Sequence, residues 1–277
     1  MSSLTGLDDV VNRLTGGNSG TPETIWFYKA PRLGAGTPVA TVQGALTSLW
    51  QYNGQPSDGA APTTVANPTN ATAGALKQTD AGGGRQKYLL GVNVTSNSAG
   101  TLILYDRLLH IGGLSGAVAT AQTVSGTLTR NTGGVGNQIW AEVYTAIGAS
   151  GATISASYTN ESATSGQTSG PAFMGGSPFE EAQRILPIPV GIGDIGVQAV
   201  ANVTLTGSTG TAGNFGINIV QPLLYIPVLA GVGANRDLIM NGPGILPISA
   251  GACLAWAWMA NTTTIPEIVG YAQFIEA

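Results

Sequence analysis

The stretch YLLGVNVT (residues 88–95) has a hydrophobic period of two, and this period decides the fold class. A period of two places alternate side chains on opposite faces of a β-strand, whereas a helix repeats every 3.6 residues. One predicted face carries Tyr88, Leu90, Val92 and Val94, and the other carries Leu89, Gly91, Asn93 and Thr95. Similar alternation is found in two later sets, Ile154, Ala156 and Tyr158, and Val197, Ala199, Ala201, Val203 and Leu205. The pattern predicts half-buried strands.

Three other runs are apolar on both faces. They are TLILY (101–105), NIVQPLLYIPVL (218–229) and CLAWAWM (253–259), and we expect them to lie between two layers or against a partner. Glycine-rich turn signals separate the apolar runs along the chain. Residues 85–277 are therefore predicted to form one mainly β domain, an antiparallel β-sandwich of jelly-roll type.

Residues 1–84 have a different pattern. Leu7, Val10, Val11 and Leu14 recur at helical spacing and predict a short N-terminal helix, whose apolar stripe needs a surface to dock on, either its own domain or a neighbour. A second helix is predicted within residues 37–52, with Pro38 in its first turn. Residues 53–84 are rich in Pro, Gly, Thr and Asn, which favours an extended arm.

Charged residues make up only 9% of the chain, against about 25% in an ordinary globular domain. Because surface charge keeps a free protein soluble and monomeric, this scarcity favours a protein that works within an assembly. A secreted or thermally hardy β protein with a Thr and Ser surface is the alternative. The net charge of −4 and the lack of a basic stripe argue against direct nucleic-acid binding.

The chain shows no sign of a membrane or a secretory route. Its N-terminus has no basic flank followed by an apolar core, and its apolar runs are shorter than the roughly 20 residues that span a bilayer. Cys253 is the only cysteine and is predicted to be a small buried hydrophobe. We expect the chain to be made in a cytoplasm and to have no membrane partner.

Candidate catalytic residues are few. Asp106 and His110, the only histidine, would share one face of a strand, and a hydrolase centred on them is the remote enzymatic alternative. GIGDIG (191–196) fits a dinucleotide-binding pattern, but a strand-like segment follows it, so it is predicted to be a turn. Glu180 and Arg184 are spaced for a helical ion pair. We predict no enzyme activity, no cofactor and no metal site.

Trp256 and Trp258 lie two residues apart and so face one side of a strand. A core or subunit contact is the favoured interpretation. Stacking of the two indoles on a sugar is the alternative.

Three stretches carry a resemblance to a known class of protein. They are YDRLLHIGGLSGAVATAQTVSGTLTR (105–130), GNQIWAEVYT (136–145) and AGACLAWAWMANTTTIPEIVG (250–270). Together they resemble structural proteins encoded among the head genes of tailed bacterial viruses, and the resemblance runs through most of residues 85–277. It implies a component of the virion made in the bacterial host, such as a minor capsid, cement or decoration protein. It carries over no catalytic residue.

The function expected from these observations is stabilisation of a phage head through contacts between subunits. The expected partners are the major capsid protein and copies of the chain itself, in a homo-oligomer for which a trimer is one candidate. The alternative is a tail or fibre protein that recognises host-surface polysaccharide through Trp256, Trp258 or Tyr158. The candidate assembly contacts are Leu4, Leu7, Val10, Val11, Leu14, Trp26, Trp50, Trp256 and Trp258.

Overall fold

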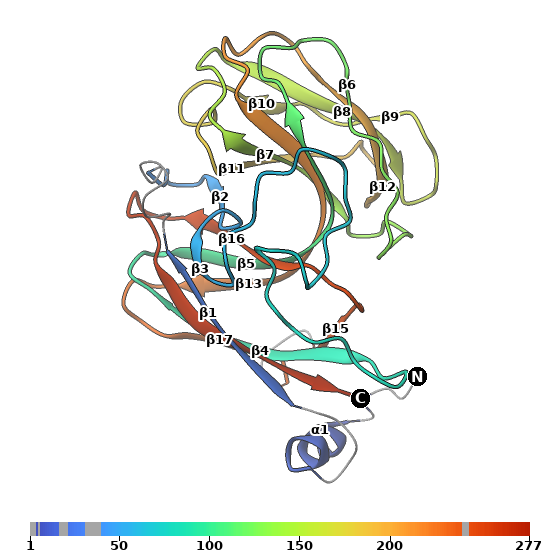
Figure 1. Cartoon of the computed structure of the whole chain (residues 1–277), viewed down its shortest axis with the longest axis vertical. Helices are drawn as coiled ribbons and strands as arrows, with labels where there is room; N and C mark the ends of the chain where they lie inside the picture. The colour runs from blue at the N-terminus through green and yellow to red at the C-terminus, as the bar shows by residue number, and fades with distance from the viewer. Residues whose placement is uncertain (1–3, 5, 17–21, 31–39, 240–243) are drawn as a thin grey trace.

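A computed structural model describes residues 4, 6–16, 22–30, 40–239 and 244–277. It confirms the predicted class, because the fold is mainly β, all pairings between its named strands are antiparallel, and a short helix lies near the N-terminus. The strands form three layers, with a closed barrel between two open sheets (Figure 1).

The barrel is the middle layer. Its strands follow the order β11 (Arg184–Ile188), β2 (Leu46–Ser48), β16 (Leu254–Ala260), β5 (Gly100–Leu114), β13 (Asn214–Val228) and β7 (Gln138–Thr145). The two longest strands, β5 and β13, pair along almost their whole length and so connect the two ends of the molecule.

A six-stranded sheet packs on one side of the barrel and a five-stranded sheet on the other. The first has the order β14 (Ala234–Asp237), β4 (Lys87–Ser96), β17 (Ile268–Glu276), β1 (Glu23–Ala30) and β3 (Asn53–Gln55), with β15 (Leu246–Ile248) also paired to β4. The second has the order β10 (Ala172–Met174), β8 (Ala152–Asn160), β12 (Val197–Leu205) and β6 (Gln122–Thr123), with β9 (Gln167–Thr168) paired to β8. Helix α1 (Leu7–Leu14) lies beyond the six-stranded sheet (Figure 1).

Most residues of the three runs that are apolar on both faces lie in the barrel strands β5, β13 and β16. In β5, Leu102 and Leu104 contribute to the core against the six-stranded sheet, whereas Ile103 and Tyr105 point into the barrel core. The wall is covered on both sides along TLILY, most of CLAWAWM and the first half of β13, which explains why these parts lack polar alternation. The end of the run 218–229 differs from the prediction, because Tyr225 and Leu229 are 50% and 67% exposed.

The alternation in YLLGVNVT holds for only part of β4. Gln273 pairs with Gly91 while Phe274 pairs with Leu89, so Leu90 is an extra residue, a β-bulge. Leu89 therefore joins Val92 in the core, and Leu90 packs on the opposite face. The predicted strand is confirmed, but the assignment of Tyr88 and Leu90 to the face of Val92 and Val94, and of Leu89 to the opposite face, was wrong.

A similar shift corrects β12. Its pairing with β8 is irregular at two positions, so Val200 takes a core position in place of Ala199 and Ala201. On β8 the prediction is confirmed, because Ile154, Ala156 and Tyr158 are all buried in the core between the barrel and the five-stranded sheet.

Two predictions about the first 84 residues differ from the structure. In the described part of residues 37–52 a turn and strand β2 replace the second predicted helix, which was wrong. The segment expected to be an arm is packed on its own chain, because Gly59 and Gly74 both lie against the Trp50 ring and Trp50 Nε1 donates to the Ala60 carbonyl oxygen at 2.9 Å. Since β1 pairs with β17 and β2 with β16, residues before and after position 84 share one sheet and one barrel.

Candidate functional site

Helix α1 uses only part of its apolar stripe to dock. Val10 is buried against Leu90 and Ile275, on the face of the six-stranded sheet that is turned away from the barrel. Leu4 is half-buried against the same group. The remaining apolar residues of the helix are exposed, with fractions of 53% for Leu7, 48% for Val11 and 45% for Leu14. Spacings of four and three residues place these three side chains on one face of the helix.

The same outer face of the sheet carries exposed aromatic side chains beyond the helix. Trp26 is 65% exposed, and its ring centroid lies 5.0 Å from that of Tyr271 on the neighbouring strand. In the next row of the sheet, Tyr28 pairs with Val269, and both are exposed. We call Trp26, Tyr28, Val269 and Tyr271 the aromatic face.

None of the four residues of the aromatic face is charged, and at its edge the exposed Glu267 lines a pocket together with Tyr28 and Val269. On β4, Asn93 pairs with Tyr271 and Thr95 pairs with Val269, so each row of the aromatic face ends in an uncharged polar residue on that strand. The neighbouring row on β1 and β17 pairs Thr24 with Gln273. Such a face contacts another protein without stripping water from an unpaired charge, which is the costly step in forming an interface. Tyr28, Val269 and Tyr271 were missed by the sequence analysis. The run TIWFYK (24–29), with aromatic residues on both faces of a strand, was a signal for Tyr28, whereas nothing in the sequence near Val269 and Tyr271 places them beside it.

Three candidate assembly contacts lie in the interior. Trp256 and Trp258 face the core between the barrel and the six-stranded sheet, and Trp50 lies inside the barrel. Each is at most 1% exposed, so none has an indole surface that another subunit or a sugar can reach in this fold. Tyr158 is also 1% exposed, and its hydroxyl donates to Asp194 and accepts from the Gly191 N–H.

Asp106 and His110 do not form an acid and base pair. Leu109 pairs with Ile219 and Arg107 with Val220, so Leu108 is an extra residue that shifts the alternation of β5. His110 consequently lies on the face of Arg107 and opposite to Asp106. The strand continues past His110 to Leu114.

Asp106 binds Arg130 rather than His110. Its carboxylate accepts from Arg130 Nε at 3.1 Å and Nη2 at 2.9 Å, and Oδ1 also accepts from the Cys253 backbone N–H at 2.9 Å. The Cys253 side chain is fully buried, as predicted. This carboxylate holds β5, β16 and the loop of Arg130 together.

His110 belongs to a polar cluster inside the barrel. Its Nδ1 accepts from Arg107 Nε at 3.0 Å, and Arg107 Nη1 donates to Glu142 Oε2 at 2.7 Å. Arg107 Nη2 also donates to the Tyr144 hydroxyl, and Asn218 Nδ2 donates to Glu142 Oε2, whereas Glu142 Oε1 has no partner among the described residues. Burial, with the neighbouring Arg107 charge adding to it, lowers the pKa of His110 to about 3. The imidazole is therefore neutral at physiological pH and acts here as a hydrogen-bond acceptor.

The remaining sequence candidates take ordinary structural roles. GIGDIG forms a turn before β12, as predicted. Arg184 pairs with Glu181 and not with Glu180, because this part of the chain forms turns in place of the helix that the spacing implied. Among the described residues there is no group of three His, Cys, Asp or Glu placed to hold a metal, and no described helix is long and apolar enough to cross a membrane.

Comparison with known proteins identifies no family. No family model matches the chain, and no curated protein does. Among solved structures, the VP2 subviral particle of infectious bursal disease virus aligns over 93% of this chain and 81% of that chain, with 10% identity and a TM-score of 0.22. A likeness this weak carries no argument about fold or function.

Proposed function

We propose that the chain is a structural protein of a bacteriophage virion, a capsid cement, decoration or minor capsid protein that holds subunits together. The observation that carries the proposal is the uncharged aromatic face, continued by the exposed stripe of α1. A monomer gains nothing from exposing Trp26 and Tyr28 beside the half-buried Tyr271, whereas aromatic residues are enriched where proteins bind one another.

The proposed mechanism is mechanical and needs no catalytic group. Packaged DNA pushes capsid subunits apart, and a protein that bridges them must lose its buried contact area before they separate. Each Å² of apolar area buried in such a contact contributes about 25 cal/mol. The proposed partners are the major capsid protein and copies of this chain, and three layers of antiparallel sheet give the contact a rigid base.

The test is occupancy on purified particles. In the double variant Trp26→Thr, Tyr28→Thr, the substituted residues favour strands but remove the aromatic surface. When this variant replaces the wild-type chain in producing cells, we expect its copy number per particle, measured by quantitative mass spectrometry, to fall at least about tenfold, the effect of losing an interface hot spot.

The matched control is Phe173→Thr, which removes a 51% exposed aromatic side chain from the five-stranded sheet. This control is expected to be incorporated normally, and both variants should keep the wild-type melting temperature. Normal incorporation of the double variant would count against the proposal.

A further inference from the structure

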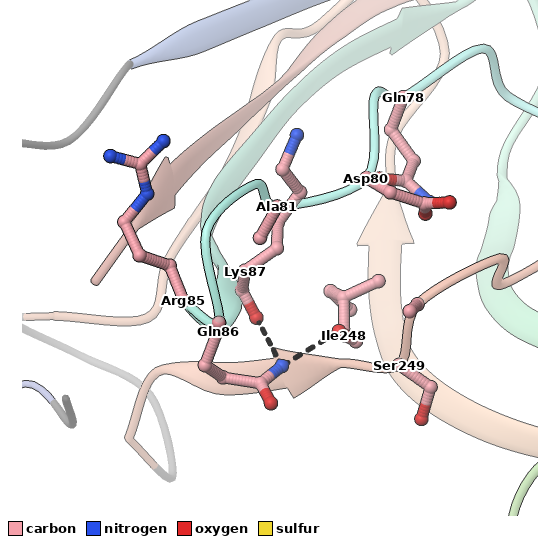
Figure 2. Close-up of a pocket in the computed structure, with 10 residues that line it drawn as sticks. Gln78, Asp80, Ala81, Arg85, Gln86, Lys87, Ile248 and Ser249 are labelled. Carbon is pink, nitrogen blue, oxygen red and sulfur yellow. Dashed lines mark hydrogen bonds between the residues drawn. The ribbon is translucent and has the colours of Figure 1, made fainter. Parts of the chain in front are cut away.

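Lys87 is a buried lysine at the start of β4, and its amine contacts a carboxylate from another strand. The Lys87 side chain is 2% exposed, and its Nζ lies 2.6 Å from Oε2 of Glu23, the first residue of β1. In Figure 2 the Lys87 side chain extends past Ala81 and away from the side chain of Gln86. Strand β17 lies between β4 and β1 in the sheet. The contact therefore joins two strands that do not pair with each other.

The surroundings of this amine are largely closed to solvent. The Phe274 ring centroid lies 5.9 Å from Lys87 Nζ, and Glu276 Oε1, on a side chain that is 8% exposed, lies 3.9 Å from it. Arg85 Nη2 lies 2.9 Å from the other oxygen of that carboxylate, Glu276 Oε2. Taking an ammonium and a carboxylate out of water is costly, whereas an amide formed between them carries neither charge. Burial therefore favours a condensed form of the pair of Lys87 and Glu23.

Thr79 lies between the amine and the carboxylate. Its hydroxyl accepts from Lys87 Nζ at 2.9 Å and donates to Glu23 Oε2 at 3.2 Å. Its backbone N–H donates to both oxygens of the same carboxylate, to Oε1 at 3.2 Å and to Oε2 at 3.3 Å. The hydroxyl is placed to pass a proton from the nitrogen to the oxygen, and the N–H is placed to stabilise negative charge on the carboxyl group during an attack. These three residues supply the groups that formation of an amide requires.

We propose that Lys87 and Glu23 condense to an isopeptide bond between β4 and β1. The ammonium gives one proton to the carboxylate, and the lone pair of the neutral Nζ attacks Cδ of Glu23. As the N–C bond forms, Thr79 Oγ1 takes a second proton from the nitrogen and gives one to Oε2. The bond from Cδ to Oε2 then breaks, and Oε2 leaves as water into the adjoining pocket of about 280 Å³. Two groups held in contact react as if at roughly 10⁵–10⁸ M, which favours condensation although water is the product.

The bond fastens the strand that carries Trp26 and Tyr28. Strand β3 pairs with β1 only at Tyr28, Lys29 and Ala30, so among the described strands β17 alone pairs with the part of β1 before Tyr28. An isopeptide bond at Glu23 prevents this part from peeling away from the sheet under load. The proposal does not depend on the assembly role proposed above.

The test is mass spectrometry of the purified full chain after denaturation. We expect the intact mass to lie one water, about 18 Da, below the mass of the sequence. Trypsin does not cleave after an acylated lysine, so it should release residues 14–29 joined to residues 86–107. Fragmentation of this joined peptide locates the link at Lys87 and Glu23, which separates it from an aspartate that has lost water by cyclising to a succinimide.

Three variants test the chemistry. Thr79→Val removes the hydroxyl but keeps the backbone N–H, and it should give at least about tenfold less joined peptide than wild type. Thr79→Ser keeps both groups and should give the wild-type amount, whereas Lys87→Arg has no amine and should give none. Wild-type chain in which residues 23 and 87 are recovered only in separate peptides, or a link from Lys87 to Glu276, would overturn the proposal whether or not the variants fold. Equal amounts of joined peptide from Thr79→Val and wild type would overturn the proton transfer through Thr79.

Discussion

Arg107 and Glu142 form an ion pair of 2.7 Å inside the barrel, where neither side chain is more than 1% exposed. Removing one partner leaves the other charge buried without compensation. We therefore expect Glu142→Gln to lower the free energy of unfolding by about 3–5 kcal/mol in urea titrations. The exposed Glu267→Gln serves as the control and should change it by less than about 0.5 kcal/mol. A Glu142→Gln variant as stable as wild type would contradict the role given to this pair.

The single histidine should make stability depend on pH. The pKa of His110 is about 3 in the folded chain and 6.5 when unperturbed, so between these values the unfolded chain binds a proton that the folded chain does not. The neutral His110 therefore contributes fully to the free energy of unfolding above pH 6.5, and this contribution is lost as the pH falls toward 3. The free energy of unfolding changes by at most about 1.4 kcal/mol per pH unit in this range. Urea titrations of wild type and His110→Asn at pH 7 and 4.5 should show a smaller loss in the variant. Equal losses would exclude His110 as the cause.

The fold class could be predicted from the sequence, because strands with one buried face show a hydrophobic period of two and the barrel strands form runs that are apolar on both faces. The side of the sheet on which a particular residue lies could not be predicted. Single-residue bulges at Leu90 and Leu108 shift the alternation, and no local sequence signal marks these bulges. The Leu108 bulge alone separates Asp106 from His110. The burial of Trp50 under residues 59–74 depends on contacts distant in sequence, which periodicity does not report.

The packing of Trp50 gives a test of the segment that was expected to be an arm. A Cβ atom at Gly59 would lie 2.2 Å from Trp50 Cε2, so Gly59→Ala forces the ring or the loop to move. We expect a loss of about 1–3 kcal/mol in the free energy of unfolding. Gly133 has no heavy atom within 4 Å of the same position, so Gly133→Ala should have little effect. Equal stability of both variants would show that the segment is loose.

The only cysteine reports on opening of the barrel wall. Burial raises the pKa of the Cys253 thiol to about 12, and the thiolate is the reactive form. At pH 8 the native chain should react with a disulfide reagent at least about 100-fold more slowly than the chain in denaturant. Fast reaction under native conditions would mean that β16 opens readily. The rate is measured from the absorbance of the thiolate that the reagent releases.

The most direct test of the central claim is sedimentation velocity of the purified chain over a range of concentrations. If the aromatic face and the α1 stripe bind copies of the chain, the wild type should sediment as a species larger than the 27.9 kDa monomer. The variant Trp26→Thr, Tyr28→Thr should then shift to the monomer, while Phe173→Thr stays assembled. A wild-type chain that remains a monomer at every concentration, indistinguishable from the double variant, would contradict self-assembly through this surface.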